Sequence, residues 1–397
     1  DGGMMIHSTL SALSLNITDG KHGDCENSPT SGYYFISCKD VRDGTIHYED
    51  ARQITERDFF DAHKRTLLEP NDILITNSGT IGRMAFVTDT PQTSKTTFQK
   101  SVAIVKPNPN KIIPKYLYYV LLNSIDSFIT QANGSAQKNL LLSTMRSFNL
   151  FIDDDKQVQA RIASILSAYD DLIENNQKQI KLLEEAAQRL YKEWFVDLRF
   201  PGWENTKIVD GVPEGWEKLP LSSFADIVMG QSPKSEFYNT THDGIPFHQG
   251  VGSYGKRFVV DNIFSNSYAR IAEAGSILFS VRAPVGRLNI TKNKIAIGRG
   301  LAALNHKKGY QSFLFYLLKD RFFKDDLLGN GSIFASISKN ELYNQVFIVP
   351  NNFLANQYNI IVSKIDRKIS IIDEQLNRLV KTRDGLLSKL MNAEMEV

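Results

Sequence analysis

The stretch from Gly250 to Lys256 could bind a nucleotide, because it matches both G-x-G-x-x-G and G-x-x-x-x-G-K. The first pattern requires a helix directly afterwards, whose N-terminus meets the phosphate. Residues 257–260 are instead strand-like. The second pattern requires Ser or Thr after the lysine to hold Mg²⁺, and Arg257 occupies that position. We therefore interpret this stretch as a glycine-rich loop between strands.

Four residues could form a zinc set: His22, Cys25, Cys38 and His47. The C-x-x-C pair that makes such patterns specific is missing, so isolated surface or small core residues are the better interpretation. Neither H-E-x-x-H nor G-x-S-x-G occurs. Three consecutive acids at 153–155 precede a helical pattern, where carboxylates favourably meet a helix N-terminus. The sequence therefore predicts no catalytic site and no metal site in this chain.

Basic residues are concentrated in one part of the chain, although the 46 basic and 44 acidic residues give a net charge of only +2. Residues 1–153 hold 15 basic and 16 acidic residues, whereas residues 220–350 hold 15 and 9. Within the second range, residues 256–308 hold ten basic residues and only two acids. Such a band indicates either a polyanion partner or a solvated surface, and charge alone does not decide between them.

The elements that would position these residues occur twice. Residues 74–83 and 278–287 both read as an apolar strand, a polar turn and then Gly-Arg, 204 residues apart. The two arginines, Arg83 and Arg287, therefore share either a phosphate contact or a structural pairing. A period near 200 residues indicates a duplicated domain rather than a short solenoid repeat.

The clearest part of the repeat is helical. An apolar 4-3 spacing runs from Ile162 to Trp194 and recurs 196 residues later from Tyr358 to Leu390. A spacing of 3.5 residues sustained over more than four heptads predicts a coiled-coil seam about 50 Å long. Neither helix has an obvious partner except the other, and we predict that they pair antiparallel. Asn176 and Arg383 are polar seam positions that would restrict register or orientation.

Two globular segments accompany these helices, and each mixes short β-like runs with one helix-like stretch. The expected class is α+β: two similar domains separated by two long helices that form an antiparallel coiled-coil spacer, a pseudo-two-fold tandem duplication. The expected boundaries are a first domain at 5–152, a spacer helix at 153–199, a Pro/Gly-rich connector at 200–216, a second domain at 217–350 and a second spacer helix at 351–397.

Composition is that of an ordinary globular protein, with 42% hydrophobic and 23% charged residues. Mean hydropathy is −0.26 and no apolar run reaches about 18 residues, so no membrane span is expected. Two cysteines exclude a disulfide scaffold and suit a reducing cytoplasm.

Several stretches resemble one known family, the specificity subunits of bacterial type I restriction–modification enzymes. They are the connector 191–202, the paired openings Asp19–Gly23 and Gly230–Pro233, and the strand-turn unit from Gly275 to Gly286. The resemblance also covers the order globule, long helix, globule, long helix.

This resemblance implies two target recognition domains, each reading half of a split double-stranded DNA sequence. It implies partnership with two modification subunits, which carry S-adenosylmethionine and methylate adenine, and with two restriction subunits, which use ATP and Mg. The chain itself would be non-catalytic and would hold no cofactor. The net acidic first domain departs from this picture, because its charge does not reveal a DNA face.

Polar and basic residues at turns are the candidates for DNA contacts, since Lys and Arg bind phosphates and side chains at base edges give specificity. In the first domain they are Lys21, His22, Lys39, Arg42, Asn77, Ser78, Thr80, Lys95 and Lys100; in the second they are Gln231, Ser232, Lys234, Tyr238, Gln249, Tyr254, Lys256, Arg257, Arg282 and Arg299. A surface role alone is the alternative for each. For the whole chain, the alternatives are a coiled-coil scaffold that binds only protein and a stand-alone nuclease. The target sequence and the spacer length do not follow from the chain.

Overall fold

The computed structural model describes residues 4–132, 139–322 and 336–395. The chain divides into two compact units, unit 1 (Asp1–Asn175 with Gln375–Val397) and unit 2 (Asn176–Glu374). The division falls inside both long helices, α5 (Lys156–Tyr191) and α9 (Asn352–Met391), so each unit holds one stretch of each helix.

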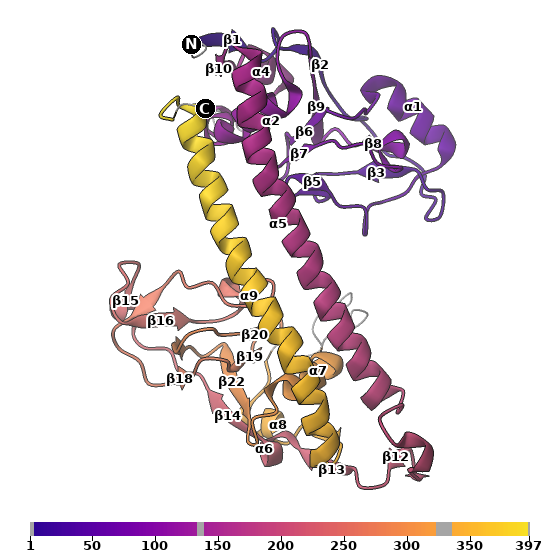
Figure 1. Ribbon diagram of the computed structural model, residues 1–397, viewed down its shortest axis with the longest axis vertical. Helices are drawn as coiled ribbons and strands as arrows, with labels where there is room; N and C mark the ends of the chain where they lie inside the picture. The colour runs from indigo at the N-terminus through magenta and orange to yellow at the C-terminus, as the bar shows by residue number, and fades with distance from the viewer. Residues whose placement is uncertain (1–3, 133–138, 323–335, 396–397) are drawn as a thin grey trace. The chain divides into compact units, whose positions relative to one another are not determined.

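Unit 1 is built on a four-stranded antiparallel sheet in the order β2-β9-β6-β7 (Figure 1). Its strands are β2 (Ser14–Asp19), β9 (Val102–Pro107), β6 (Ile73–Thr76) and β7 (Met84–Phe86). All four residues of β6 are buried, as expected for an apolar run between two other strands. Beside the sheet, β3 (Tyr34–Ile36) pairs parallel with β8 (Thr96–Phe98). The smaller strands are β1 (Met5–Thr9) with β10 (Asn149–Asp153), and β4 (Val41–Arg42) with β5 (Thr45–Ile46).

The short helices of unit 1 are α1 (Glu56–Thr66), α2 (Pro114–Asn123), α3 (Ile125–Ala132), α4 (Leu142–Ser147) and the 3₁₀ turn η1 (Thr93–Lys95). Thr55 caps α1 by accepting the backbone N–H of Asp58, and Pro114 begins α2, where a missing N–H costs nothing. Asp155 accepts the N–H of Gln157 at 2.7 Å at the start of α5. This contact confirms the predicted capping role for Asp155, whereas the carboxylate of Asp154 binds the N–H of Met4.

Unit 2 repeats the sheet with the same strand order, β14-β22-β19-β20. Its strands are β14 (Ala225–Met229), β22 (Leu301–His306), β19 (Ile277–Ser280) and β20 (Leu288–Ile290). A second, five-stranded sheet holds β15 (Tyr238–Asn239), β17 (Phe264–Ser265), β16 (Ile245–His248), β21 (Ile295–Ile297) and β18 (Ile271–Ala272). As in unit 1, one pair, β16 with β21, is parallel.

The remaining elements of unit 2 are β13 (Glu217–Pro220) paired with β23 (Val346–Val349), and the hairpin β11 (Ile208–Val209) with β12 (Val212–Pro213). The helices are α6 (Leu221–Phe224), α7 (Gln311–Phe322) and α8 (Lys339–Tyr343), with short turns at η2 (Lys192–Val196), η3 (Trp203–Asn205), η4 (Ser235–Phe237) and η5 (Val251–Ser253). The two copies confirm the predicted α+β class and the tandem duplication.

The two long helices run antiparallel within each unit. In unit 1, Ile162 of α5 lies in the same buried cluster as Leu387 and Leu390 of α9. In unit 2, Tyr358 at the start of α9 donates its hydroxyl to the carbonyl oxygen of Ala187 at 3.0 Å. A parallel pair would instead bring Ile162 next to Tyr358, so the predicted orientation is confirmed.

One of the two polar seam positions has a specific partner. Arg383 of α9 binds Asp170 of α5 within unit 1, at 2.9 Å between Nη1 and Oδ1. Asn176 is half-buried. An ion pair at a partly buried seam position is satisfied in one register only, so Arg383 restricts how the helices pair in unit 1. Across the described ranges, no helix combines the length and apolar character that crossing a bilayer demands.

Candidate nucleic-acid interface

A glycine follows the first strand of each four-stranded sheet, because the backbone there packs directly against another segment. A Cβ at Gly20 would lie 2.1 Å from the carbonyl oxygen of Phe98, and one at Gly230 would lie 2.1 Å from that of Gly298. Such distances leave no room for a side chain. The next residue in each unit donates its backbone N–H to the facing segment. Lys21 donates to the carbonyl oxygen of Phe98 at 2.8 Å, and Gln231 donates to that of Ile297 at 2.9 Å.

A third segment meets these two. It follows β3 in unit 1 and β16 in unit 2. The N–H of Gln99 binds the carbonyl oxygen of Ile36 at 3.0 Å, and that of Gly298 binds the carbonyl oxygen of His248 at 2.8 Å. We call this three-segment meeting the recognition edge. It consists of residues 20–22, 36–38 and 99–101 in unit 1, and of residues 230–232, 248–250 and 298–300 in unit 2.

A repeated turn adjoins the recognition edge in each unit. Thr76 and Ser280 end equivalent strands, and each hydroxyl accepts the N–H of an arginine seven residues later, at 2.9 Å from Arg83 and 2.8 Å from Arg287. Each hydroxyl also donates to a carbonyl inside its turn. Part of the Gly-Arg repeat is therefore structural, because the arginine backbone closes the turn. The side chain of Arg83 is exposed and reaches the carbonyl oxygen of Cys38 at 3.3 Å.

The recognition edge of unit 1 borders a surface depression of about 760 Å³. It gathers four of the predicted DNA contacts: His22, Asn77, Ser78 and Lys100. Asn77 is only 8% exposed, and its Oδ1 is buried without a hydrogen-bond partner among the described residues. An unsatisfied buried carbonyl is costly unless a ligand or water binds it. The depression therefore offers an acceptor for a base amino group, at Asn77, and a cation for a phosphate, at Lys100.

Acidic neighbours offset much of the positive charge at this edge. Lys21 binds Asp61 at 2.8 Å, and this contact raises the pKa of the Lys21 ammonium. His22 binds Asp19 at 3.0 Å, and Arg65 binds the same carboxylate at 2.6 Å. Lys100 is exposed, and its ammonium has no partner in the described ranges. Its charge is thus available to an anion, whereas that of Lys21 is largely compensated.

Four predicted residues of unit 1 lie outside the lining of the depression. Lys39 is exposed in the turn before β4, Arg42 is exposed in β4 itself, Lys95 is exposed in η1, and Thr80 is exposed in the turn after β6. The depression also has members that sequence reasoning missed, namely Asp19 and the segment 139–143. No sequence pattern marks that segment. It adjoins Asn77 because the N–H of Leu140 donates to the Asn77 carbonyl oxygen at 2.8 Å.

The recognition edge of unit 2 carries uncharged amides and one arginine. Ser232 donates its hydroxyl to Oε1 of Gln249 at 2.7 Å, and the N–H of Arg299 binds the same hydroxyl at 3.1 Å. Gln231, Gln249 and Arg299 are exposed. Arg282 is exposed in the adjoining turn, whose backbone pairs with Ser336. This group brings together five residues predicted to contact DNA.

Two other predicted residues of unit 2 remain at the surface. Lys234 and Lys256 are exposed on loops. Tyr238 is half-buried, donates its hydroxyl to the carbonyl oxygen of Pro233 at 3.0 Å and packs on the ring of Phe247. Its hydrogen bond supports the segment that begins at the recognition edge, so its role is mainly structural.

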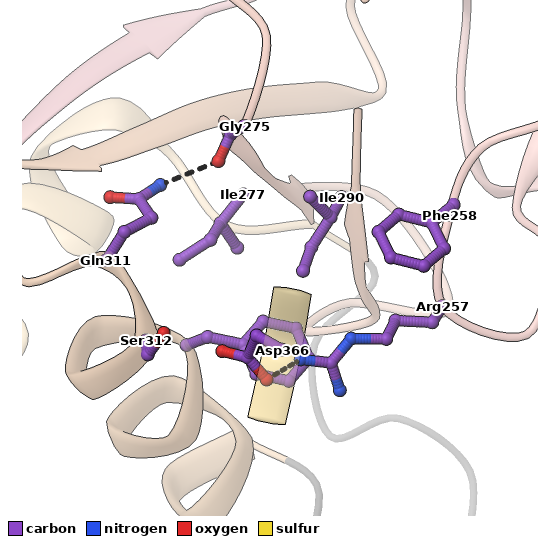
Figure 2. A pocket seen from close by; sticks show the side chains of 9 residues that line it. Arg257, Phe258, Gly275, Ile277, Ile290, Gln311, Ser312 and Asp366 are labelled. Carbon is purple, nitrogen blue, oxygen red and sulfur yellow. Dashed lines mark hydrogen bonds and ion pairs between the residues drawn. The ribbon is translucent and has the colours of Figure 1, made fainter. Parts of the chain in front are cut away.

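Arg257 is a correction to the predicted DNA contacts. It is only 5% exposed, and its guanidinium binds Glu184 of α5 at 3.0 Å and Asp366 of α9 at 2.6 Å. It also lies 4.5 Å from the ring centre of Phe315. A cavity of about 160 Å³ lies beside the Arg257–Asp366 pair (Figure 2). Arg257 therefore fixes the globule to the helices, because burial and two carboxylates leave it nothing to offer a phosphate.

Tyr254 is a second correction. Its hydroxyl is buried without a partner among the described residues, and the ring packs against the cluster around Ile295. Burial raises the pKa of the Tyr254 hydroxyl. A hydroxyl shielded in this way cannot donate to a base or phosphate, so the predicted contact is replaced by a packing role.

The basic band at 256–308 is divided among several surfaces. Lys292 binds Asp373 of α9 at 2.9 Å, and Lys294 binds Glu273 at 3.3 Å. Lys307 donates to the carbonyl oxygen of Ser222 at 2.7 Å. Three of the ten basic residues, Arg257, Lys292 and Lys294, thus bind acids of the same unit, so the band does not act as one DNA face.

One arrangement resembles a hydrolytic triad. Nδ1 of His248 lies 2.7 Å from Oγ of Ser253, and its Nε2 lies 2.9 Å from Oδ1 of Asp261. The bond from His248 lowers the pKa of the Asp261 carboxyl. His248 is completely buried, so no substrate can reach it. The three side chains hold the loop that follows Gln249.

The residues considered as a zinc set have separate surroundings. Cys25 lies in a buried cluster with Phe35, Ile54 and Phe59, and His47 faces Asp43 and Glu49 at 3.7 Å each. Among the residues whose positions are described, no group of three or more His, Cys, Asp or Glu could hold a metal ion.

Comparison with known proteins identifies relatives along most of the chain. A family model described as the type I restriction modification DNA specificity domain matches residues 22–185 and again residues 213–381. A putative type I restriction enzyme MjaX specificity subunit from Methanocaldococcus jannaschii is 32% identical over 310 residues, which cover 75% of this chain and 72% of that protein. The MjaIX specificity subunit of the same organism is 25% identical over 364 residues, covering 87% and 82%.

One solved structure agrees with this chain at the level of the fold. The crystal structure of a type I restriction-modification system S subunit from M. genitalium aligns with a TM-score of 0.61 at 18% identity, covering 98% of this chain and 96% of that one. The family model matches both copies, and the MjaX relative is 32% identical in sequence over 75% of this chain. The chain therefore belongs to the type I restriction-modification DNA specificity family.

Proposed function

We propose that this chain is the DNA specificity subunit of a type I restriction–modification enzyme, and that each unit reads one half of a bipartite target. The observation that carries the proposal is the recognition edge, where two backbone hydrogen bonds of unit 1, those from Lys21 and Gln99, recur in unit 2 while the side chains differ. Unit 1 presents Lys21, His22 and Lys100 where unit 2 presents Gln231, Ser232 and Arg299. A shared backbone arrangement that carries different side chains in the two units suits two half-sites of different sequence.

The residues that we retain as DNA contacts have exposed or partly exposed polar groups at the recognition edges and nearby loops, apart from Asn77, which is buried but lines the depression of unit 1. They are Lys21, His22, Lys39, Arg42, Asn77, Ser78, Thr80, Lys95, Lys100, Gln231, Ser232, Lys234, Gln249, Lys256, Arg282 and Arg299. Phosphate contacts would supply affinity, whereas the side chains at the recognition edges would supply sequence discrimination.

In this proposal the chain does no chemistry of its own. Two modification subunits would carry S-adenosylmethionine and methylate adenine, and two restriction subunits would use ATP and Mg²⁺ to move and cut DNA. The helices α5 and α9 would act as the spacer between half-sites. The two cysteines, Cys25 and Cys38, are free, which suits work in the cytoplasm.

The test is binding and methylation by the purified chain, with and without its modification subunits, on a pool of random DNA fragments. We expect sequence-selective binding and adenine methylation only when the subunits are combined. Methylation mapping should then report one bipartite motif. Cleavage or methylation by the chain alone would contradict the non-catalytic role. A combined complex without sequence preference would favour a scaffold that binds only protein.

A further inference from the structure

The backbone around Gln249 is held on both sides, so its side chain starts from a defined place. Gln249 directly follows β16, after the completely buried His248. The carbonyl oxygen of His248 accepts the N–H of Gly298 at 2.8 Å, and that of Gln249 accepts the N–H of Gly300 at 3.1 Å. The side chain of Gln249 is nevertheless exposed. An exposed side chain on a fixed backbone is the arrangement that precise recognition requires.

Ser232 fixes the orientation of the Gln249 amide. The N–H of Arg299 can only donate, so the Ser232 hydroxyl oxygen is its acceptor, at 3.1 Å. The hydroxyl proton remains to be donated, and Oε1 of Gln249 lies 2.7 Å away. In the opposite amide orientation that proton would have no acceptor among the described residues and would have to bind water. Gly298 leaves room for this contact, since a Cβ there would lie 2.6 Å from Oε1.

The fixed amide leaves a donor and an acceptor side by side at the surface. Nε2 has no hydrogen-bond partner among the described residues, and Oε1 keeps a second lone pair. This pair complements N7 and the N6 amino group of adenine in the major groove, the base that a Gln amide reads with two hydrogen bonds. Holding the amide before binding lowers the entropy lost when those bonds form.

The equivalent position of unit 1 lacks this device. Ser37 follows β3 as Gln249 follows β16. Its hydroxyl and its backbone N–H both bind Asp40 within the same turn, at 2.9 Å and 2.7 Å. Ser37 is therefore committed to its own turn, and unit 1 has no anchored amide at this position.

We propose that Gln249 reads one adenine of the half-site recognised by unit 2, and that Ser232 is the positioning residue that holds its amide. The inference rests on the proposed function. It adds the base that is read, adenine, the residue that reads it, Gln249, and the residue that positions the reader, Ser232. Arg299 lies next to this pair, and its exposed guanidinium can bind a neighbouring phosphate or guanine.

The experiment uses the full chain assembled with its modification subunits. Methylation rates are measured on duplexes in which each position of the second half-site is replaced in turn by the other bases. With Gln249→Leu, discrimination at one adenine position should fall about 5- to 150-fold while discrimination at the other positions is retained. With Gln249→Glu, the preference at that position should move to a cytosine, because a carboxylate accepts from its N4 amino group.

Ser232→Ala should weaken discrimination at the same position, and Ser232→Thr, which keeps the hydroxyl, should restore it. A general loss of stability would not select one base position. Gln231→Leu is the matched control, because it removes a neighbouring exposed amide whose side chain has no anchor in the described ranges. Its effect at that adenine should be smaller than the effect of Gln249→Leu.

The two failures are distinguishable. If the wild-type complex shows no bipartite preference, the proposed function fails and this inference fails with it. If the wild-type complex has a bipartite preference but Gln249→Leu and Ser232→Ala keep full discrimination at every position, only the inference is overturned. Equal losses at the same position from Gln249→Leu and Gln231→Leu would also overturn it.

Discussion

The two units use the same tyrosine and aspartate beside their helix pairs but take the neighbouring cation from different places. In unit 1, Tyr119 donates to Asp170 at 2.6 Å, and Arg383 of α9 supplies the cation. In unit 2, Tyr316 donates to Asp366 at 3.3 Å, and the cation is Arg257 from the globule. The phenol and carboxylate thus repeat at intervals of 197 and 196 residues, whereas the cation does not.

This difference explains why net charge misleads in this chain. Unit 2 needs basic residues in its globule because Arg257 and Lys292 neutralise acids on the long helices. In unit 1, the corresponding cation comes from α9 and lies outside residues 1–153. The more basic second domain is therefore not evidence that it binds DNA more strongly than the first.

The largest expected effect comes from removing the buried cation of unit 2. Arg257→Ala leaves Glu184 and Asp366 without their partner, and breaking a buried pair in this way costs about 3–5 kcal/mol. Burial raises the pKa of Asp366, and Arg257 is the largest of the interactions that lower it, ahead of hydrogen bonds from Ser312 and Tyr316. Tryptophan fluorescence during urea unfolding measures the loss, because Trp194, Trp203 and Trp216 all lie in unit 2.

Arg383→Ala is the matched variant of unit 1, and hydrogen exchange of α2 amides measures its effect there. The side chain of Arg383 is 22% exposed, compared with 4% for Arg257, so we expect a loss of about 1 kcal/mol. Equal losses from the two variants would show that the two junctions do not differ in burial as described.

The second prediction concerns the acid sensitivity that His306 gives to unit 2. Burial lowers the pKa of His306 to about 4, from 6.5. The unfolded chain therefore binds the proton more readily, so unit 2 should lose about 1–3 kcal/mol as the pH falls from about 6.5 towards 4. Nδ1 of His306 accepts the N–H of Lys308 at 3.1 Å, a bond that requires the neutral ring. The strand register places Pro107 at the equivalent site of unit 1.

Urea unfolding followed by tryptophan fluorescence between pH 7 and pH 4 measures this loss. His306→Asn keeps an acceptor but does not titrate, so it should flatten this part of the pH profile. A profile unchanged by the substitution would assign the acid sensitivity of unit 2 to another group.

A smaller difference is expected from the two phenols. Tyr119→Phe should cost about 1–2 kcal/mol in unit 1, because a hydroxyl 2.6 Å from a carboxylate forms a strong charge-assisted bond. Tyr316→Phe should cost less in unit 2, where the corresponding distance is 3.3 Å. Hydrogen exchange in α2 and α7 measures both. A larger loss for Tyr316→Phe would reverse the comparison.

The smallest effects concern salt dependence of DNA binding by the assembled enzyme. Lys100→Ala and Arg299→Ala occupy equivalent positions of the two recognition edges, and each should reduce the salt slope by about one if it removes a phosphate contact. Lys21→Ala should reduce it less, because Asp61 already compensates that charge. An equal reduction from Lys21→Ala would mean that DNA displaces Asp61.

The periodic features of the fold were predictable from the sequence because periodicity is local. The heptads predicted the two helices and their pairing, and the strand-turn repeat at 74–83 and 278–287 predicted the duplication. The recognition edges were only partly predictable. Gln231 and Ser232 were expected from the resemblance at the domain opening, but the bond between Ser232 and Gln249 depends on how three segments meet.

The errors have a common physical cause. Arg257 was expected at the DNA surface, yet its carboxylate partners are 73 and 109 residues away in the chain. Ser37 was not recognised as the counterpart of Gln249, because a single serine carries no sequence pattern. Only the equivalence of β3 with β16 identifies its position. Sequence spacing reveals which residues repeat, but long-range pairing decides which charges remain free to bind DNA.

The most direct test of the account is exchange of one domain. Residues 5–152 are replaced by the equivalent domain of a related specificity subunit, and the complex with its modification subunits is analysed by methylation mapping. If each unit reads through its own recognition edge, one half of the bipartite motif should change and the half read by unit 2 should remain. A motif in which both halves change would contradict independent reading by the two units.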